Sequence, residues 1–444
     1  LSIYPLHFVL KLCIQRMATG SDKHFDLDEP EYRHEHAEDP SDDSDDDNGE
    51  SNDTTDESSD SSGTKHSSDQ SNNSSSVEID SGDESSNSSS SMECDSDEES
   101  TEFQSKSQEQ VNKLATGIFT ARSGRQWTTS EPRKYKIPSA NILRQKRGIG
   151  RPVAGIQTVR EAFDLMITPE MIVLLVRETN RRASCTIRKW NDENPGKEQT
   201  WRATDVDEIR AFIGLLILTG VHRSKNNTLS ELWSMMDGLP IFRATMSETR
   251  FKTLLRFCRF DNGETRSERM KQDKLAPIRE LWTMFLTRLP LCYTPGGSLT
   301  IDEQLVPTRG RCSFRQYMPS KPGKYGLKLF WCCDSKTAYP LAGEVYLGRQ
   351  PNTTASNVND NRINNLVKRL VQPWNNTGRT ITTDNYFTDI KLAEDLLGVQ
   401  TTLVGTIRPT RREVPRELYA NRWRSEQSSI FCFDRQLTLV SYVP

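Results

Sequence analysis

Two aspartates in the second half of the chain have the residue type and placement that metal-dependent phosphate chemistry requires. Asp302 lies in a short β-prone run, 299–306, bounded by a Pro-Gly-Gly turn before it and a proline after it. Asp384 follows a second β-prone run, and leucines at helical spacing come after it. If the two strands are neighbours in one sheet, these carboxylates can hold Mg²⁺, which prefers a few oxygen ligands plus water and substrate phosphates.

Each acidic candidate also has a plainer interpretation. A carboxylate in a strand is costly to bury unless a cation faces it, so Arg309 or Arg311 could simply pair with Asp302. Asp334 is a third acidic candidate, but the sequence Asp334-Ser335-Lys336 is typical of a hairpin turn, where aspartate is common for structural reasons. The sequence leaves the salt-bridge interpretation of Asp302 open.

A dense series of cations follows Asp302, and aromatic residues are interleaved with it. Basic residues near a metal pair can hold a phosphate backbone, and aromatic rings can stack on an unpaired base. The alternative is that the aromatic residues belong to the core and half of the cations are solvated. The candidate DNA-binding residues are Arg309, Arg311, Arg315, Lys321, Lys324 and Lys328, with Phe314, Tyr317 and Tyr325 among them.

These residues form part of a longer co-linear series of motifs. The strings LTIDEQLVP, FRQYMPSKPGKYGLK, CDS, YLGR, TDNYFT and LVGTIRP occur in this order. From about Asp164 to Pro444 the chain closely resembles the transposase domain of the piggyBac family of DNA transposons. The resemblance implies an α/β protein with a ribonuclease H-like catalytic core, in which Asp302 and Asp384 are catalytic metal ligands. It places a third aspartate in a motif beyond FCFDRQLTLVSY, so we expect the core to be incomplete at Pro444.

The same resemblance implies a function. We expect a nuclear, homodimeric DNA transposase that uses Mg²⁺ for cut-and-paste transposition, with strand nicking, excision through hairpin ends and insertion at TTAA. Its DNA partners would be the transposon ends and the TTAA target. Two other classes remain: a domesticated or truncated transposase-derived DNA-binding or chromatin protein without catalysis, and a nuclease that cuts without joining ends.

The charge distribution favours a polyanionic partner. Residues 22–102 carry 29 acidic and 3 basic side chains, whereas residues 103–444 carry 53 basic and 33 acidic ones, a net charge of +20. Neutralising phosphates with such a basic body releases counterions, which makes nucleic acid the expected partner. A solvated cationic surface is the alternative.

Cysteine and histidine usage excludes other metal and catalytic classes. The nine cysteines include no pair at the two-residue spacing of a zinc knuckle, and nothing matches the zinc-binding segment of the family. His222 is the only histidine in the basic body, which argues against a histidine-rich metal site or a serine-type triad.

The N-terminal part is expected to be disordered. Residues 1–107 are rich in Ser, Asp and Glu with little to bury. The region could compete with DNA for the basic body or act as a solubilising tail. Residues 1–14 are apolar but too short to span a membrane, and we expect translation to start at Met17. Serines ahead of acidic residues are candidate sites for an acid-directed kinase: Ser41, Ser44, Ser59 and Ser96.

Three further regions follow. Residues 108–155 are expected to be a basic linker, in which RQKRGIGRP is either a minor-groove hook or an ordinary linker or nuclear-import signal. Residues 156–297 are expected to be a helical DNA-binding and dimerisation domain, whose cations Arg250, Lys252, Arg256 and Arg259 could follow a phosphate backbone. Residues 298–444 are the expected catalytic core. The expected helices run from Pro169 to Ala183, Thr204 to Gly220, Glu248 to Phe260, Leu275 to Arg288 and Asn357 to Val371. Thr204 is expected to cap the second of them and Ser247 the third.

Overall fold

The computed structural model describes most of the chain from residue 117 onward. The described ranges are 117–132, 142–143, 145–224, 227–308, 310, 312–348, 362–419 and 424–444. The expected acidic region 1–107 lies outside them with its candidate phosphorylation sites, as do Arg144 of the candidate hook and the cations Arg309 and Arg311.

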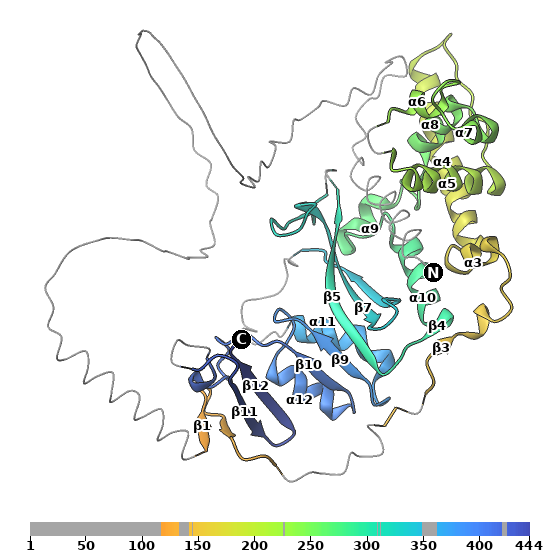
Figure 1. The fold of residues 1–444 in the computed structure, drawn as a ribbon. Helices are drawn as coiled ribbons and strands as arrows, with labels where there is room; N and C mark the ends of the chain where they lie inside the picture. The colour runs from red at the N-terminus through yellow and green to blue at the C-terminus, as the bar shows by residue number, and fades with distance from the viewer. Residues whose placement is uncertain are drawn as a thin grey trace, which may run out of the picture. The chain divides into compact units, whose positions relative to one another are not determined.

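Helices dominate the region ahead of the sheet, as the sequence predicts (Figure 1). Ser247 caps its helix as expected, because its side chain accepts the N–H of Arg250. In the helix expected from Thr204, the capping side chain is instead Asp205, which accepts the N–H of Glu208. The helices are α3 (Val159–Met166), α4 (Pro169–Glu193), α5 (Val206–Val221), α6 (Leu229–Trp233), α7 (Pro240–Thr245), α8 (Glu248–Phe257), α9 (Arg266–Gln272) and α10 (Arg279–Cys292).

Three of these helices differ from the sequence expectation in their bounds. α8 ends at Phe257 instead of Phe260. α4 continues to Glu193 instead of ending near Ala183. α10 begins at Arg279 rather than Leu275. The turn before α10 is held by Asp273, which accepts the N–H of Leu275 and binds Arg279 at 2.6 Å, and a proline in this turn disfavours an earlier helical start.

The described residues after α10 form a six-stranded sheet in the order β10–β9–β5–β7, and both β6 and β8 also pair with β7 (Figure 1). β5, β9 and β10 are parallel, whereas β7 is antiparallel to β5. The predicted hairpin is present, and Asp334 holds its turn by accepting the N–H groups of Lys336 and Thr337. The strands are β5 (Ser298–Pro307), β6 (Gln316–Tyr317), β7 (Tyr325–Asp334), β8 (Pro340–Val345), β9 (Thr380–Thr383) and β10 (Thr402–Gly405).

Helices cover both faces of this sheet. On one face, α11 (Arg362–Val371) and α12 (Ile390–Gly398) pack their leucines and valines against Leu299, Ile301 and Ile381. On the other face, Trp331 of β7 packs against Trp282 of α10 with ring centroids 5.6 Å apart. Both faces of the sheet are therefore covered by helices, and a substrate can reach the sheet only at its edge.

Part of the segment expected as a basic linker is folded against the C-terminal strands. β1 (Ile118–Thr120) pairs with β2 (Gln126–Thr128), which pairs with β11 (Ser429–Asp434) and through it with β12 (Leu437–Tyr442). Trp127 is fully buried and donates its indole N–H to the carbonyl of Glu413. Further along, the short strand β3 (Gly148–Ile149) pairs with β4 (Tyr293–Thr294), which directly follows α10.

In the described part of the chain, each helix is too short or too polar to cross a lipid bilayer.

Candidate active site

Asp302 and Asp384 lie at the same level on neighbouring parallel strands. The last register pair between β5 and β9 is Ile301 with Thr383, and each aspartate follows this pair by one residue. Because paired strands lie about 4.8 Å apart, the backbone positions of the two aspartates are close to one another. Ile301 and Thr383 are buried whereas both aspartates are exposed, so the edge presents two acids to solvent above an apolar layer.

Local backbone groups orient both carboxylates. The Oδ1 atom of Asp302 accepts the N–H of Glu303 at 2.7 Å, and Oδ1 of Asp384 accepts the N–H of Tyr386 at 3.0 Å. Among the described residues, neither aspartate forms an ion pair. Arg309 and Arg311, the partners that the salt-bridge interpretation names, lie outside these residues.

Lys328 of β7 lies within the electric field of both aspartates. Its ammonium group is 4.5 Å from the ring centroid of Tyr386 and 5.0 Å from that of Phe330. Burial lowers the pKa of Lys328 below its usual value, and the negative charges of Glu303 and the two aspartates oppose this shift. The arrangement provides one cation, held by aromatic rings, at the edge where a phosphate would approach the carboxylates.

β5 and β7 continue past the aspartates as a two-stranded arm, here called the β5–β7 arm, which spans residues 303–330. Its register runs from the pair Glu303–Phe330 to the pair Pro307–Gly326, beyond the end of the pairing with β9. Four of the six candidate DNA-binding residues in this range lie among the described residues. Arg315 lies over the Tyr325 ring, Lys321 binds Glu303 at 3.2 Å, Lys324 is exposed, and Lys328 is half-buried.

Asp334 has a structural role at the turn between β7 and β8. It is 1% exposed, and its carboxylate also accepts the N–H of Gly296 at 2.7 Å. Burial raises the pKa of Asp334, but the hydrogen bonds from Gly296, Thr337 and Lys336 outweigh it and hold the pKa below its usual value. Its oxygens are thus engaged in holding the loop and the turn, as the plainer interpretation predicts.

The donor set at the edge fits a hard divalent cation. Within the described residues, no group of three or more His, Cys, Asp or Glu side chains is arranged to hold a metal ion. Two neighbouring carboxylates match Mg²⁺, which keeps several waters and takes further oxygens from substrate phosphates. They do not match a structural zinc site, which needs four protein ligands.

Sequence reasoning missed a further cation near this edge, Arg408. β10 ends at Gly405, in register with Thr383, so the loop that follows begins beside Asp384. Burial raises the pKa of Tyr386, and the positive charge of Arg408, which lies in this loop, acts in the opposite direction. The signal in the sequence is the run RPTRR shortly after the β-prone residues of β10.

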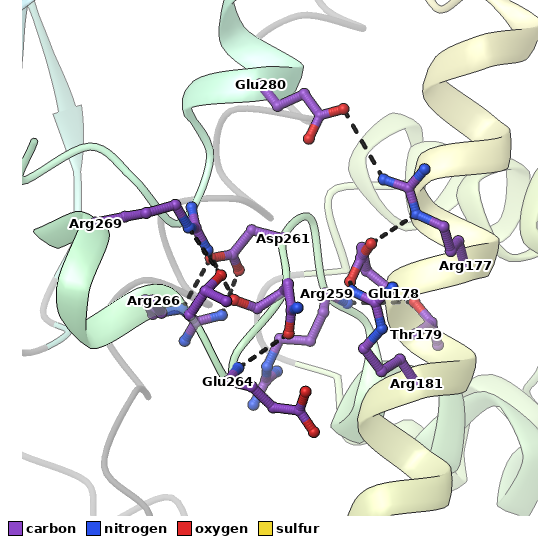
Figure 2. Close-up of polar contacts among 12 residues, drawn as sticks. Arg177, Glu178, Thr179, Arg181, Arg259, Asp261, Glu264, Arg266, Arg269 and Glu280 are labelled. Carbon is purple, nitrogen blue, oxygen red and sulfur yellow. Dashed lines mark hydrogen bonds and ion pairs between the residues drawn. The ribbon is translucent and has the colours of Figure 1, made fainter.

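The helical region presents a second set of arginines, held by buried carboxylates (Figure 2). Glu178 of α4 is 2% exposed and Asp261, after α8, is 5% exposed. Each carboxylate binds two guanidinium groups, so both acids are compensated and the arginines are fixed in position. Fixed guanidinium groups are suited to phosphate contacts because less side-chain entropy is lost on binding. The pairs are Arg177 and Arg181 at Glu178, and Arg266 and Arg269 at Asp261.

Arg250 differs from the expectation that it follows a phosphate backbone. Its side chain is 12% exposed, binds Glu208 at 2.5 Å and lies 4.6 Å from the ring centroid of Trp201. Lys252 is engaged by Glu248 at 2.6 Å. Arg250 therefore links α8 to α5, whereas Lys252 pairs with a residue of α8 itself. The sequence did not reveal these pairs, because Glu208 is far away in sequence and an acid four residues before a lysine is common on helices.

Comparison with known proteins identifies the family. A model of the family described as Transposase IS4 matches residues 158–443, more than half of the chain. A relative from Homo sapiens, piggyBac transposable element-derived protein 3, is 23% identical over 260 residues, 57% of this chain and 40% of that protein. The chain belongs to the piggyBac family of transposases. The human Chimeric ERCC6-PGBD3 protein is also 23% identical over 260 residues, which are 22% of its length.

A solved structure of a piggyBac transposase shares the mixed α/β fold. The match is to the cryo-EM structure of its synaptic complex with hairpin DNA, with a TM-score of 0.62 and 38% sequence identity. It covers 68% of this chain and 61% of that one. The piggyBac resemblance inferred from the motifs is confirmed, and the chain spans two fifths or less of the length of the human relatives.

Proposed function

We propose that this chain is a piggyBac-type DNA transposase in which Asp302 and Asp384 hold divalent metal ions, Mg²⁺ in the first instance, for phosphoryl transfer. The observation that carries the proposal is the level position of these two carboxylates on adjacent strands. The element order supports a ribonuclease H-like core, because strand β5, hairpin β7–β8, helix α11, strand β9, helix α12 and strand β10 follow one another as expected for that fold.

In this proposal the residues of the chain bind and orient the DNA. A bound divalent cation would lower the pKa of a water and polarise a phosphoryl oxygen. Lys328 and the arm cations would hold the backbone on either side of the scissile phosphate. Water would attack phosphorus as the 3′ oxygen leaves, and the freed 3′-hydroxyl would then attack a second phosphodiester, so each step exchanges one phosphorus–oxygen bond for another.

We also propose the DNA substrates, the oligomeric state and the cellular location of this protein. The net charge of +20 on residues 103–444 supports DNA as the partner, and the related piggyBac structure was solved with hairpin DNA. We extend this to binding of transposon ends, excision through hairpins, insertion at TTAA, a homodimeric state and a nuclear location.

The test is cleavage of labelled duplex DNA by the purified chain with and without Mg²⁺. Asp302→Asn and Asp384→Asn should each abolish Mg²⁺-dependent nicking while salt-sensitive DNA binding persists. Asp237→Asn, an exposed change in the helical region, should retain both activities. Nicking by either of the first two variants would disprove the metal assignment.

A second candidate function is DNA binding without catalysis. It is favoured by the observation that the described residues bring two carboxylates, and no third ligand, to the sheet edge. In that case the unmodified chain would bind DNA with the same salt dependence as both Asn variants, and none of the three would nick DNA at any Mg²⁺ concentration. Joining of DNA ends would separate a transposase from a simple nuclease.

A further inference from the structure

Two tyrosines at the far end of the β5–β7 arm form an exposed aromatic stack. Tyr317 of β6 and Tyr325 of β7 are directly opposite in the strand register, with ring centroids 4.7 Å apart and planes inclined by 35°. The guanidinium carbon of Arg315 lies 5.4 Å from the Tyr325 centroid. Despite these contacts, Tyr317 is 58% exposed and Tyr325 is 47% exposed.

The exposure of this stack is what requires an explanation. A cross-strand aromatic pair stabilises a hairpin by only a small amount, and smaller residues would serve this purpose without exposing so much ring surface. A flat ring next to a guanidinium group is the arrangement on which nucleic-acid bases stack, because every base has a π-face and arginine adds a cation–π contribution.

The cations around the tyrosine stack indicate which kind of partner binds to it. Lys324 precedes Tyr325, and Lys321 lies in the same turn, where it is held by Glu303. An apolar protein partner would have to desolvate these cations, whereas the backbone of a nucleic acid would pair with them. The occupant that satisfies both the rings and the cations is a DNA strand with an unpaired base.

The register gives the distance from this stack to the candidate catalytic edge. Trp331 pairs with Asp302, and Tyr325 lies six positions before Trp331 on β7. At about 3.3 Å per residue this separation is about 20 Å. At about 3.4 Å per stacked nucleotide it corresponds to about six nucleotides.

We propose that Tyr317 and Tyr325, with Arg315, form a stacking platform for an unpaired base of the DNA, about six nucleotides from the phosphate held at Asp302 and Asp384. The platform recognises the absence of base pairing rather than a particular base, since stacking tolerates any sequence. This inference rests on the proposed function because it assumes that DNA lies along the arm.

The test compares two duplexes that differ only in one unpaired dinucleotide, bound by the full chain in the presence of EDTA. Replacing one unpaired adenine with 2-aminopurine gives a second readout, because stacking on a tyrosine quenches its fluorescence. The unmodified chain should prefer the interrupted duplex by about 5-fold to 150-fold, the range expected for one stacked base, and should quench the probe.

Matched variants separate stacking from hairpin stability. Tyr317→Ala and Tyr317→Leu should lose both the preference and the quenching, and their affinity for the fully paired duplex should stay within about 2-fold, because the phosphate contacts remain. Tyr317→Phe should keep the preference, because phenylalanine also presents a flat ring to the base. Tyr442→Ala removes another exposed tyrosine, 55% exposed on β12, and should change neither.

The outcomes distinguish this proposal from the proposed function. If the chain binds the paired duplex but shows no preference, or if Tyr317→Leu retains the preference and the quenching, the tyrosines are only a hairpin pair and the platform is disproved. If the chain binds neither duplex, the proposed function fails with it. The Leu variant keeps apolar bulk in the hairpin, so the test stands even if Tyr317→Ala unfolds the arm.

Discussion

Asp302 and Asp384 each lie one residue beyond Ile301 and Thr383, the buried pair that ends the register between β5 and β9. This relationship ties the chemistry of the edge to the packing of the sheet. A one-residue slip of β5 would turn Asp302 to the opposite face and bring Ile301 to the edge. The core formed by Leu299, Ile301 and Ile381 is therefore what fixes the acids in position.

Thr388 is predicted to position Asp384. Its hydroxyl donates to the Asp384 carbonyl at 2.7 Å and lies 2.8 Å from the hydroxyl of Thr383. Thr388→Val removes these bonds from a buried site and should cost about 1–2 kcal/mol in the free energy of unfolding, measured by urea denaturation. Metal affinity should fall about 10-fold, because groups behind a ligand control its orientation. Thr388→Ser should restore the affinity, and an unchanged affinity in the Val variant would exclude this role.

Lys328 is predicted to contact a DNA phosphate. Lys328→Gln should weaken binding of all DNA sequences to a similar extent and reduce the slope of log affinity against log salt by about one unit. Lys328→Arg, which keeps the charge beside the Tyr386 ring, should preserve the slope. The measurement is fluorescence anisotropy over a series of salt concentrations. An unchanged slope in the Gln variant would show that Lys328 only balances the charge of Glu303 and the aspartates.

The ion pair between Glu208 and Arg250 should make stability depend on acidic pH. Hydrogen bonds from Arg250 hold the pKa of Glu208 at about 2, well below the usual value of 4.5, although burial opposes this shift. A depressed folded-state pKa gives stability that is present above pH 4.5 and is lost as the pH falls toward 2. Urea denaturation should therefore show a falling free energy of unfolding across this window.

Glu208→Gln provides the control for that pH dependence. It should lower stability at pH 7 by about 2 kcal/mol, because Arg250 loses its charged partner in a largely buried site. The variant should then lose less stability than the unmodified chain between pH 4.5 and lower pH. Equal acid sensitivity of the two proteins would mean that other carboxylates control the acid transition.

Local signals in the sequence predicted much of the fold. The Ser247 cap, the turn at Asp334 and the two β-prone runs carrying the aspartates each depend on a few neighbouring residues, and the structure contains all of them. The motif series also pointed to the piggyBac family, which the comparisons confirm. The register of β5 and β9 was expected only as a possibility, because nothing local sets the pairing of strands about 80 residues apart.

The features that the sequence did not predict depend on distant partners. Trp127 looked like part of a linker because its neighbours in space, Val414, Leu418 and Cys432, come almost at the end of the chain. Arg125 next to it binds Glu394 of α12 and Asp434 of β11, which fixes this segment to the helix that follows Asp384. The sequence alone does not show which basic residues already form ion pairs with acidic residues of the same chain.

The most direct measurement of the central claim is binding of a metal ion to Asp302 and Asp384 themselves. Tb³⁺ is a hard, oxygen-binding cation whose luminescence can be excited through a nearby tryptophan, and Trp331 is the register partner of Asp302. Residues 22–102 contain Tyr32 but no tryptophan, so with excitation at a wavelength that only tryptophan absorbs, Tb³⁺ bound to that acidic segment would not be excited through its own residues.

We predict a saturable luminescence signal in the full chain that Mg²⁺ displaces. Asp302→Asn and Asp384→Asn should each abolish the saturable component, because two carboxylates are needed, whereas Asp237→Asn should retain it. A saturable, Mg²⁺-displaceable signal that survives in either of the first two variants would contradict the assignment of these aspartates as the metal site.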